Sequence, residues 1–109
     1  MIRITMARSN GRNVGFDCTG HAGFAEEGKD IVCSAVSAVT QTAVIGITEI
    51  AKIPAGVSVG DDGIRCILGA DATETQCGQA DLLLSSMEAG LVAIGKAYPH
   101  TLKITDREV

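Results

Sequence analysis

The chain has 109 residues, of which 46% are hydrophobic and 20% are charged, and its formal net charge is −4 at pH 7. This length fits one domain over residues 1–109, and the hydrophobic content excludes disorder of the whole chain. No cluster of Lys or Arg is present that would follow a phosphate backbone, so we expect no nucleic-acid partner.

The first elements in chain order are two predicted strands. Residues 2–8 alternate apolar and polar side chains, as a half-buried strand does, and in the next segment Val14, Phe16 and Cys18 alternate with smaller or polar residues. Between them, Ser-Asn-Gly-Arg at residues 9–12 is typical of a tight hairpin turn. The sequence therefore predicts an antiparallel hairpin.

A long helix is predicted after a glycine-rich segment at residues 20–29. Asp30 is expected to cap it, because its carboxylate can accept hydrogen bonds from the N–H groups that a first turn leaves unpaired. The helix is expected to run to about Lys52, with apolar residues over most of its circumference, which predicts burial on several sides. Ser, Thr and Gln interrupt the uncharged stretch 31–48, so we favour a core helix over a membrane span.

The second half of the chain repeats the pattern. Residues 57–59 and 64–68 flank Gly-Asp-Asp-Gly and predict another hairpin. A second helix is expected from about residue 75 to residue 97, followed by a last strand at residues 101–105. The order ββαββαβ predicts an α+β fold: a single two-layer domain with a mostly antiparallel sheet, a central buried helix and a second helix packed on it.

The four cysteines form no CxxC pair and have no zinc-ligand spacing to His21 or His100, so we expect no metal. The N-terminal segment is typical of a strand, not of a signal peptide, which favours a cytoplasmic protein with reduced thiols. We expect core or structural positions for three of the cysteines: Cys18, Cys66 and Cys77.

The fourth cysteine suggests a site. Cys33 lies twelve residues after His21, near the third position of the predicted helix. The unpaired N–H groups and the dipole of a helix N-terminus favour a thiolate, as does a nearby imidazole, and the same N–H groups can stabilise an oxyanion. His100 follows Pro99 and is expected at the far end, which leaves His21 as the candidate base.

Spacing alone leaves other interpretations open. A cysteine in an apolar helix is more often a small core residue, and a histidine in a loop is more often solvated or a cap. Ser37 lies one turn after Cys33 on the same face, where it hydrogen-bonds near the sulfur, to a bound peptide, or only to the helix carbonyls. Asp30 is a candidate for orienting His21.

These residues resemble a known family, the ribosomal-processing cysteine proteases (Prp). The similarity is concentrated in the first third of the chain, extends through Tyr98–Pro99 to the final strand, and departs from the usual pattern at Ser34, where the family more often has Ala. The matching motif is Gly20–His21–Ala22, Gly28, Asp30–Ile31–Val32–Cys33 and Ala35–Val36–Ser37.

The resemblance implies a Cys/His endopeptidase in which Cys33 is the nucleophile and His21 its base. It implies a small α/β domain, usually a homodimer, with no metal or organic cofactor. It also implies a substrate: the N-terminal extension of large-subunit ribosomal protein twenty-seven, a hydrophobic peptide that ends in aromatic residues. We expect neither nucleic acid nor membrane as a partner.

The segment between the second strand and the helix is long and glycine-rich enough to form a mobile wall or lid for such a peptide. Phe24 at its centre either covers the empty site, contacts the peptide, or folds back onto the core. The residues expected to form this substrate loop are Gly20, Ala22, Gly23, Phe24 and Gly28.

Two rival functions use the same residues. The first is a non-catalytic, ribosome-associated module that binds a hydrophobic peptide. The second is a thiol redox sensor at Cys33. The protease is favoured, because a redox role has no need of the paired histidine.

Overall fold

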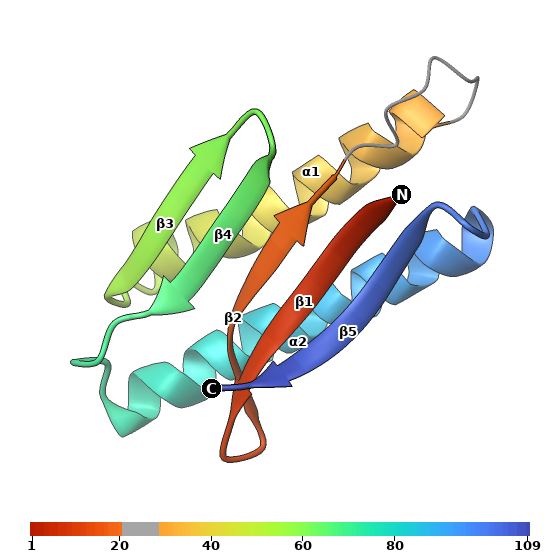
Figure 1. Ribbon diagram of the computed structural model, residues 1–109. Helices are drawn as coiled ribbons and strands as arrows, with labels where there is room; N and C mark the ends of the chain where they lie inside the picture. Colours follow the sequence, from red (N-terminus) through yellow and green to blue (C-terminus); the bar gives the residue numbers. More distant parts are fainter. Residues whose placement is uncertain (21–28) are drawn as a thin grey trace.

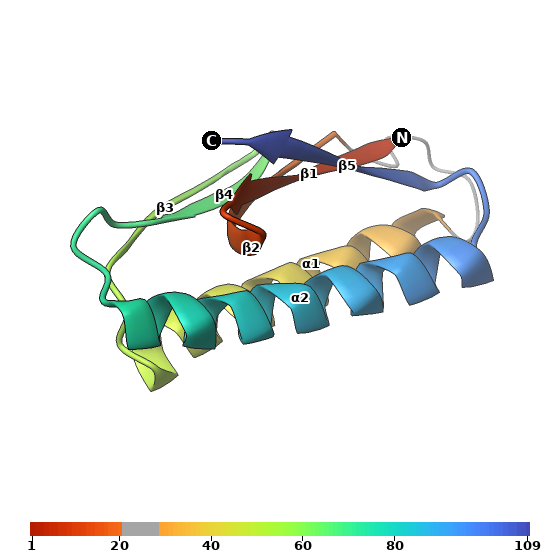
Figure 2. The same cartoon turned by 90° about the horizontal axis from the view of Figure 1, so that it is seen from below.

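The computed structural model describes residues 1–20 and 29–109, with only the backbone of Lys29 and Asp30. The expectations for His21, Ala22, Gly23, Phe24 and Gly28 therefore lie outside the described residues. A five-stranded sheet forms one layer, and the helices lie together on one of its faces (Figures 1 and 2). The predicted two-layer α+β fold and its order ββαββαβ are confirmed.

The sheet has the strand order β3-β4-β2-β1-β5, which leaves β3 and β5 at its edges. Most neighbours are antiparallel, as predicted, but β5 runs parallel to β1. The sheet is therefore mixed. The strands span β1 (Ile2–Ser9), β2 (Arg12–Thr19), β3 (Ala55–Gly60), β4 (Gly63–Leu68) and β5 (Leu102–Glu108).

Both predicted hairpin turns are present. Between β1 and β2, Asn10 and Gly11 have φ angles of 53° and 78°, as a two-residue turn with two left-handed central residues requires. Between β3 and β4, Gly60 pairs with Gly63 across the two aspartates of the turn. These turns bring strands that are adjacent in sequence into register.

One detail of β2 differs from the predicted alternation. Ala7 pairs with Gly15 and Arg8 pairs with Asn13, so Val14 is an extra residue in β2, a β-bulge. The bulge reverses the side-chain alternation, and Asn13 rather than Val14 is fully buried. Phe16 and Cys18 keep their predicted inward positions.

The first helix begins earlier than predicted. It spans α1 (Lys29–Ile45) and continues as a π-helical turn, η1 (Gly46–Ile50). Asp30 is thus the second helical residue, not the cap that precedes the helix. The wider turn closes through a hydrogen bond of 2.8 Å from the Ala51 N–H to the Gly46 carbonyl, close to the predicted helix end.

The expectation that this helix is buried on several sides is wrong. Its inward face packs in the core through Val32, Val36, Thr40, Ala43 and Ile47. Its outward face has no neighbour in the described chain, and Ile31, Ile45 and Ile50 are 59%, 47% and 78% exposed. Periodicity did not reveal this, because apolar residues lie on both faces.

The same helical segment, Ile31–Ile50, is long and apolar enough to cross a membrane, with a mean hydropathy of 1.7 over its best window. That is weak evidence, since the core helix of a soluble protein passes the same test. Its exposed face also carries the polar residues Ser34, Gln41 and Glu49.

The second helix, α2 (Glu74–Ala97), lies beside α1 on the same face of the sheet (Figure 2). Thr73 caps it: its Oγ1 accepts a hydrogen bond from the Gln76 N–H (3.2 Å), and the Thr73 N–H donates to Gln76 Oε1 (2.9 Å). Its core face has four buried residues and two half-buried ones: Ala80, Leu84, Met87, Leu91, Leu83 and Ile94.

Candidate active site

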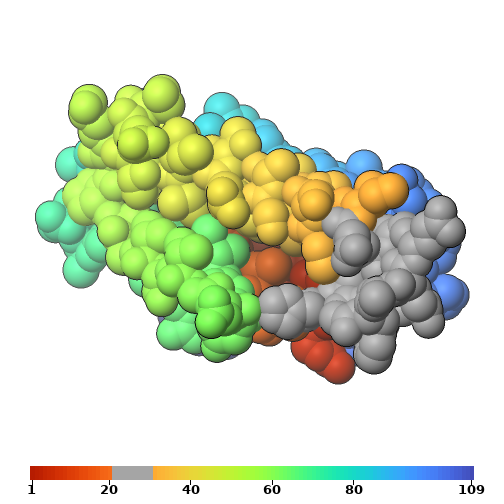
Figure 3. All heavy atoms as spheres, turned by 90° about the horizontal axis from the view of Figure 1, so that it is seen from above, coloured from red at the N-terminus to blue at the C-terminus, as the bar shows by residue number. Residues whose placement is uncertain are grey.

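A pocket of about 160 Å³ lies between α1 and the ends of β2 and β4. In Figure 3 it is the hollow between α1 and the β3–β4 hairpin, with the first two strands at its floor. Its floor is mainly apolar and includes Cys18, Val36 and Ile64. Its rim is polar and includes the exposed side chains of Ser37, Gln41 and Asp61. An apolar floor under a polar rim suits an apolar side chain attached to a peptide backbone.

Cys33 lies in this pocket, half-buried against the core. It is the fifth residue of α1 and not near the third, because the helix begins before Asp30. The unpaired N–H groups of a helix start belong to its first four residues, so here they precede Cys33. The sulfur therefore lies one turn into the helix, near the positive end of its dipole.

Ser37 and Gln41 follow Cys33 at intervals of four residues and line the same pocket. The three side chains thus share one face of α1. Ser37 was predicted from the sequence as a site residue, whereas Gln41 and Asp61 were not. The signal for Gln41 was present as a polar residue two turns after Cys33, whereas Asp61 reaches the pocket only through the pairing of β4 with β2.

Gly20, at the end of β2, also lines the pocket. Because His21 is the next residue along the chain, the backbone reaches the pocket one residue before the predicted base. The structure thus brings together Cys33, Ser37 and Gly20. It places only the backbone of Asp30, and the remaining predicted site residues lie outside the described ranges.

The backbone at Gly20 requires glycine for two reasons. Its φ is +83°, and a Cβ would lie 2.6 Å from the carbonyl oxygen of Met1. Gly11 provides a matched control, since its φ is +78° but an added Cβ would meet nothing within 4 Å. We expect Gly11→Ala to lower the free energy of unfolding by about 1 kcal/mol and Gly20→Ala by about 2–4 kcal/mol, measured by urea denaturation. Equal losses would contradict the clash with Met1.

Two other cysteines lie in the core. Burial raises the pKa of the Cys18 thiol to about 11, with the negative charge of Asp17 adding to the effect, and burial also raises the pKa of Cys66. Both remain protonated near neutral pH, in the core positions predicted for them. Cys77 is half-buried in the first turn of α2, away from the pocket, and all four cysteines are free of disulfide bonds.

His100 was expected at the far end from Cys33. The connection between α2 and β5, which carries it, instead lies at the same end of the molecule as the start of α1 (Figures 1 and 2). His100 has a φ of +66° and does not line the pocket. Parallel pairing of β5 with β1 produces this arrangement. Among the described residues, no three His, Cys, Asp or Glu side chains are grouped as a metal site requires.

Comparison with known proteins identifies the family of the chain. A family model described as cysteine protease Prp matches residues 1–103. The chain belongs to the Prp family. It is 33% identical over 108 residues to the ribosomal processing cysteine protease Prp of Bacillus subtilis, and the match covers 96% of each chain.

Solved structures of the Prp family share the fold. The chain matches the essential ribosomal processing protease Prp of Staphylococcus aureus in complex with a substrate peptide, with a TM-score of 0.81 and 25% identity. It matches a complex of that protease with a covalently linked product peptide at a TM-score of 0.80 and 26% identity. Both matches cover 98% of this chain and 100% of the other.

The predicted family and enzyme class are therefore confirmed. The protein is a Prp family cysteine protease of ribosomal processing, a hydrolase that acts on peptide bonds.

Proposed function

We propose that the protein is an endopeptidase that uses Cys33 as its nucleophile and His21 as the base, and that it removes the hydrophobic N-terminal extension of large-subunit ribosomal protein twenty-seven. The observation that carries this proposal is the pocket in which Cys33 lies near the start of α1 and the residue before His21 forms part of the wall.

The reaction follows from these positions. His21 accepts the proton of the Cys33 thiol, and the thiolate attacks the scissile carbonyl carbon. The oxyanion forms near the N-terminal end of α1, where unpaired N–H groups and the helix dipole stabilise negative charge. His21 then protonates the departing amine, and water hydrolyses the thioester to regenerate the thiol.

Ser37 and Asp30 have supporting roles in this proposal. Ser37 is exposed at the pocket rim one turn after Cys33, where its hydroxyl is placed to bond to the bound peptide. Asp30 is assigned to orienting His21. An orienting carboxylate holds an imidazole in the tautomer that accepts a proton from the nucleophile.

The substrate assignment rests on the chemistry of the pocket and on the family. The floor of Cys18, Val36 and Ile64 suits an apolar side chain, and the related protease binds a substrate peptide. Because none of the four cysteines forms a disulfide bond, we also propose a reducing, cytoplasmic location.

The test is cleavage of a synthetic peptide that carries an apolar segment ending in two aromatic residues, followed by small polar residues. We expect the wild-type protein to cut it once, after the aromatic residues, with the cut site read by mass spectrometry. Binding of the peptide without cleavage would favour the non-catalytic binding module. If the protein neither binds nor cleaves the peptide, this substrate is excluded.

We further propose that the protein is a homodimer that covers the outward face of its helices. Ala38, Thr42 and Met87 belong to the lining of an apolar groove between α1 and α2 of about 350 Å³, next to the exposed Ile45. Apolar helix faces of this kind are typical of subunit interfaces. Light scattering is expected to give twice the mass of one chain for the wild type and the mass of one chain for Ile45→Asp. A monomeric wild type would contradict the proposal.

A further inference from the structure

The two edges of the sheet differ in how they meet solvent. An edge strand exposes unpaired N–H and C=O groups, and proteins usually protect such edges with charged side chains. The β5 edge fits that rule, with exposed charges at Lys103, Asp106 and Arg107. The β3 edge does not: its sequence, Ala-Gly-Val-Ser-Val-Gly, has no charge, and Val57 and Val59 are 42% and 69% exposed.

The free backbone groups of β3 belong to the same two valines. In a hairpin with a two-residue turn, the pair that flanks the turn is hydrogen-bonded and the pairs then alternate. Gly60 and Gly63 flank the turn, so Gly60, Ser58 and Gly56 face β4 with their N–H and C=O groups. Those of Val57 and Val59 therefore point outward, where the described chain places no other strand.

The side chains of these valines lie on the helix-facing side of the sheet. Cross-strand partners share a face, and the partner of Val57 is Cys66, which is fully buried in the core. The partner of Val59 is Ile64, on the floor of the Cys33 pocket. An extended chain on this edge thus meets an apolar surface that faces α1.

This edge is continuous with the active-site pocket. Val59 and Gly60 both line the pocket that holds Cys33. An extended peptide whose scissile bond lies at Cys33 therefore has a direct path past Gly60 onto the outer edge of β3. Side by side with β3, its backbone would gain hydrogen bonds without regard to sequence, and its apolar side chains would contact the valines.

We infer that β3 is the substrate-binding edge of this protease: one flank of the peptide adds to the sheet as a sixth strand, pairs with the outward backbone groups of Val57 and Val59, and packs apolar side chains against them. This inference rests on the proposed endopeptidase function. In this arrangement, backbone pairing with β3 provides affinity for the peptide. The Cys33 pocket selects the side chain next to the scissile bond.

The first experiment changes only the substrate. The synthetic extension peptide is prepared with a single backbone N-methyl group at each position in turn, which removes one N–H donor. We expect kcat/KM to fall about three- to tenfold at alternate residues on one flank of the cut, because only every second N–H of an added strand faces its partner. A loss without this alternation, or no loss on either flank, overturns the inference.

The second experiment removes one outward N–H group of β3 on the protein. Val57→Pro deletes an outward N–H, a position at which an edge strand tolerates proline, and is expected to raise KM about three- to tenfold. The control is Ser58→Ala, whose side chain lies on the opposite face and whose backbone groups are unchanged; it is expected to leave KM within about twofold. The Val57 carbonyl remains in this variant and still accepts from the peptide N–H, so N-methylation of the paired residue is expected to lower kcat/KM further.

The outcomes separate the two proposals. A wild-type protein that does not cleave the unmodified peptide overturns the endopeptidase function and this inference with it. Cleavage by the wild type combined with an unchanged KM in the Val57→Pro protein overturns only the inference. A Val57→Pro protein that changes its mass in light scattering but not its KM assigns the edge to a second copy of the chain, which also overturns it.

Discussion

Replacing Cys33 with serine is expected to lower kcat/KM for the extension peptide by at least about 10³-fold, measured by fluorescence or mass spectrometry of the released fragment. A serine hydroxyl is far less acidic than a thiol, and it is a poor nucleophile where the site is built to form a thiolate. The exchange of sulfur for oxygen changes little volume. Folding is therefore expected to be nearly unaffected, so the loss reports on chemistry.

Cys77→Ser is the matched control for this change. Cys77 lies in the first turn of α2, close to a helix N-terminus as Cys33 is, and is also half-buried, but it lies outside the Cys33 pocket. Its substitution is expected to leave kcat/KM within about twofold. Residual cleavage by Cys33→Ser at more than about a tenth of the wild-type rate would remove Cys33 as the nucleophile.

The elements of the fold could be predicted because their signals are local. Alternation in β1, the Asn-Gly turn and the Gly-Asp-Asp-Gly turn each depend on residues that are neighbours in sequence. The parallel pairing of β5 with β1 could not be predicted, because it joins the two ends of the chain. No local pattern encodes which edge of the sheet the last strand takes. That pairing also moved the connection that carries His100 to the same end of the molecule as the start of α1.

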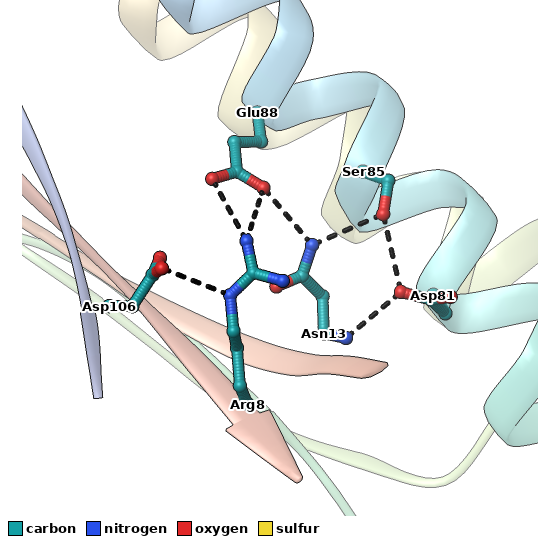
Figure 4. A network of polar contacts seen from close by, with 6 residues as sticks. All are labelled: Arg8, Asn13, Asp81, Ser85, Glu88 and Asp106. Atoms are coloured by element: carbon teal, nitrogen blue, oxygen red, sulfur yellow. Dashed lines mark hydrogen bonds and ion pairs between the residues drawn. The ribbon is translucent and has the colours of Figure 1, made fainter. Parts of the chain in front are cut away.

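The β-bulge in β2 shows the same limit at a single residue. Val14 suggests an inward position, yet the fold places Asn13 inside because α2 supplies its partners. Asn13 donates to Ser85 and Glu88 with its side chain and to Asp81 with its backbone N–H (Figure 4). The network also includes ion pairs of 3.3 Å from Arg8 to Glu88 and from Arg8 to Asp106. Buried polar groups need such partners, which come from a distant helix.

The candidate site was predicted in part. The sequence identified Cys33, Ser37 and Gly20 as one unit, and the structure places them around one pocket. The prediction from the sequence placed the helix start too late, because it took Asp30 as the capping residue. Gln41 was missed although it lies on the same face of α1 as Cys33, whereas Asp61 and the free edge of β3 were missed because their position near Cys33 depends on how the sheet packs on α1.

The second large effect concerns the base. His21→Asn is expected to lower kcat for the extension peptide by about 10²–10⁴-fold, as the loss of a general base does. It is also expected to change the alkylation of Cys33 by iodoacetamide. An imidazolium beside the sulfur favours the reactive thiolate, so the alkylation rate at neutral pH should be lower in the variant than in the wild type. A structural role for His21 would leave this rate unchanged.

His100→Asn is the matched control, because it makes the same substitution at the other histidine. Asparagine also tolerates the positive φ of 66° at this position. The variant is expected to leave kcat and the alkylation rate unchanged. A loss of cleavage in His100→Asn with an active His21→Asn would reverse the assignment. His100, on the α2–β5 connection, would then be the base for Cys33. His21 would serve only to hold the peptide.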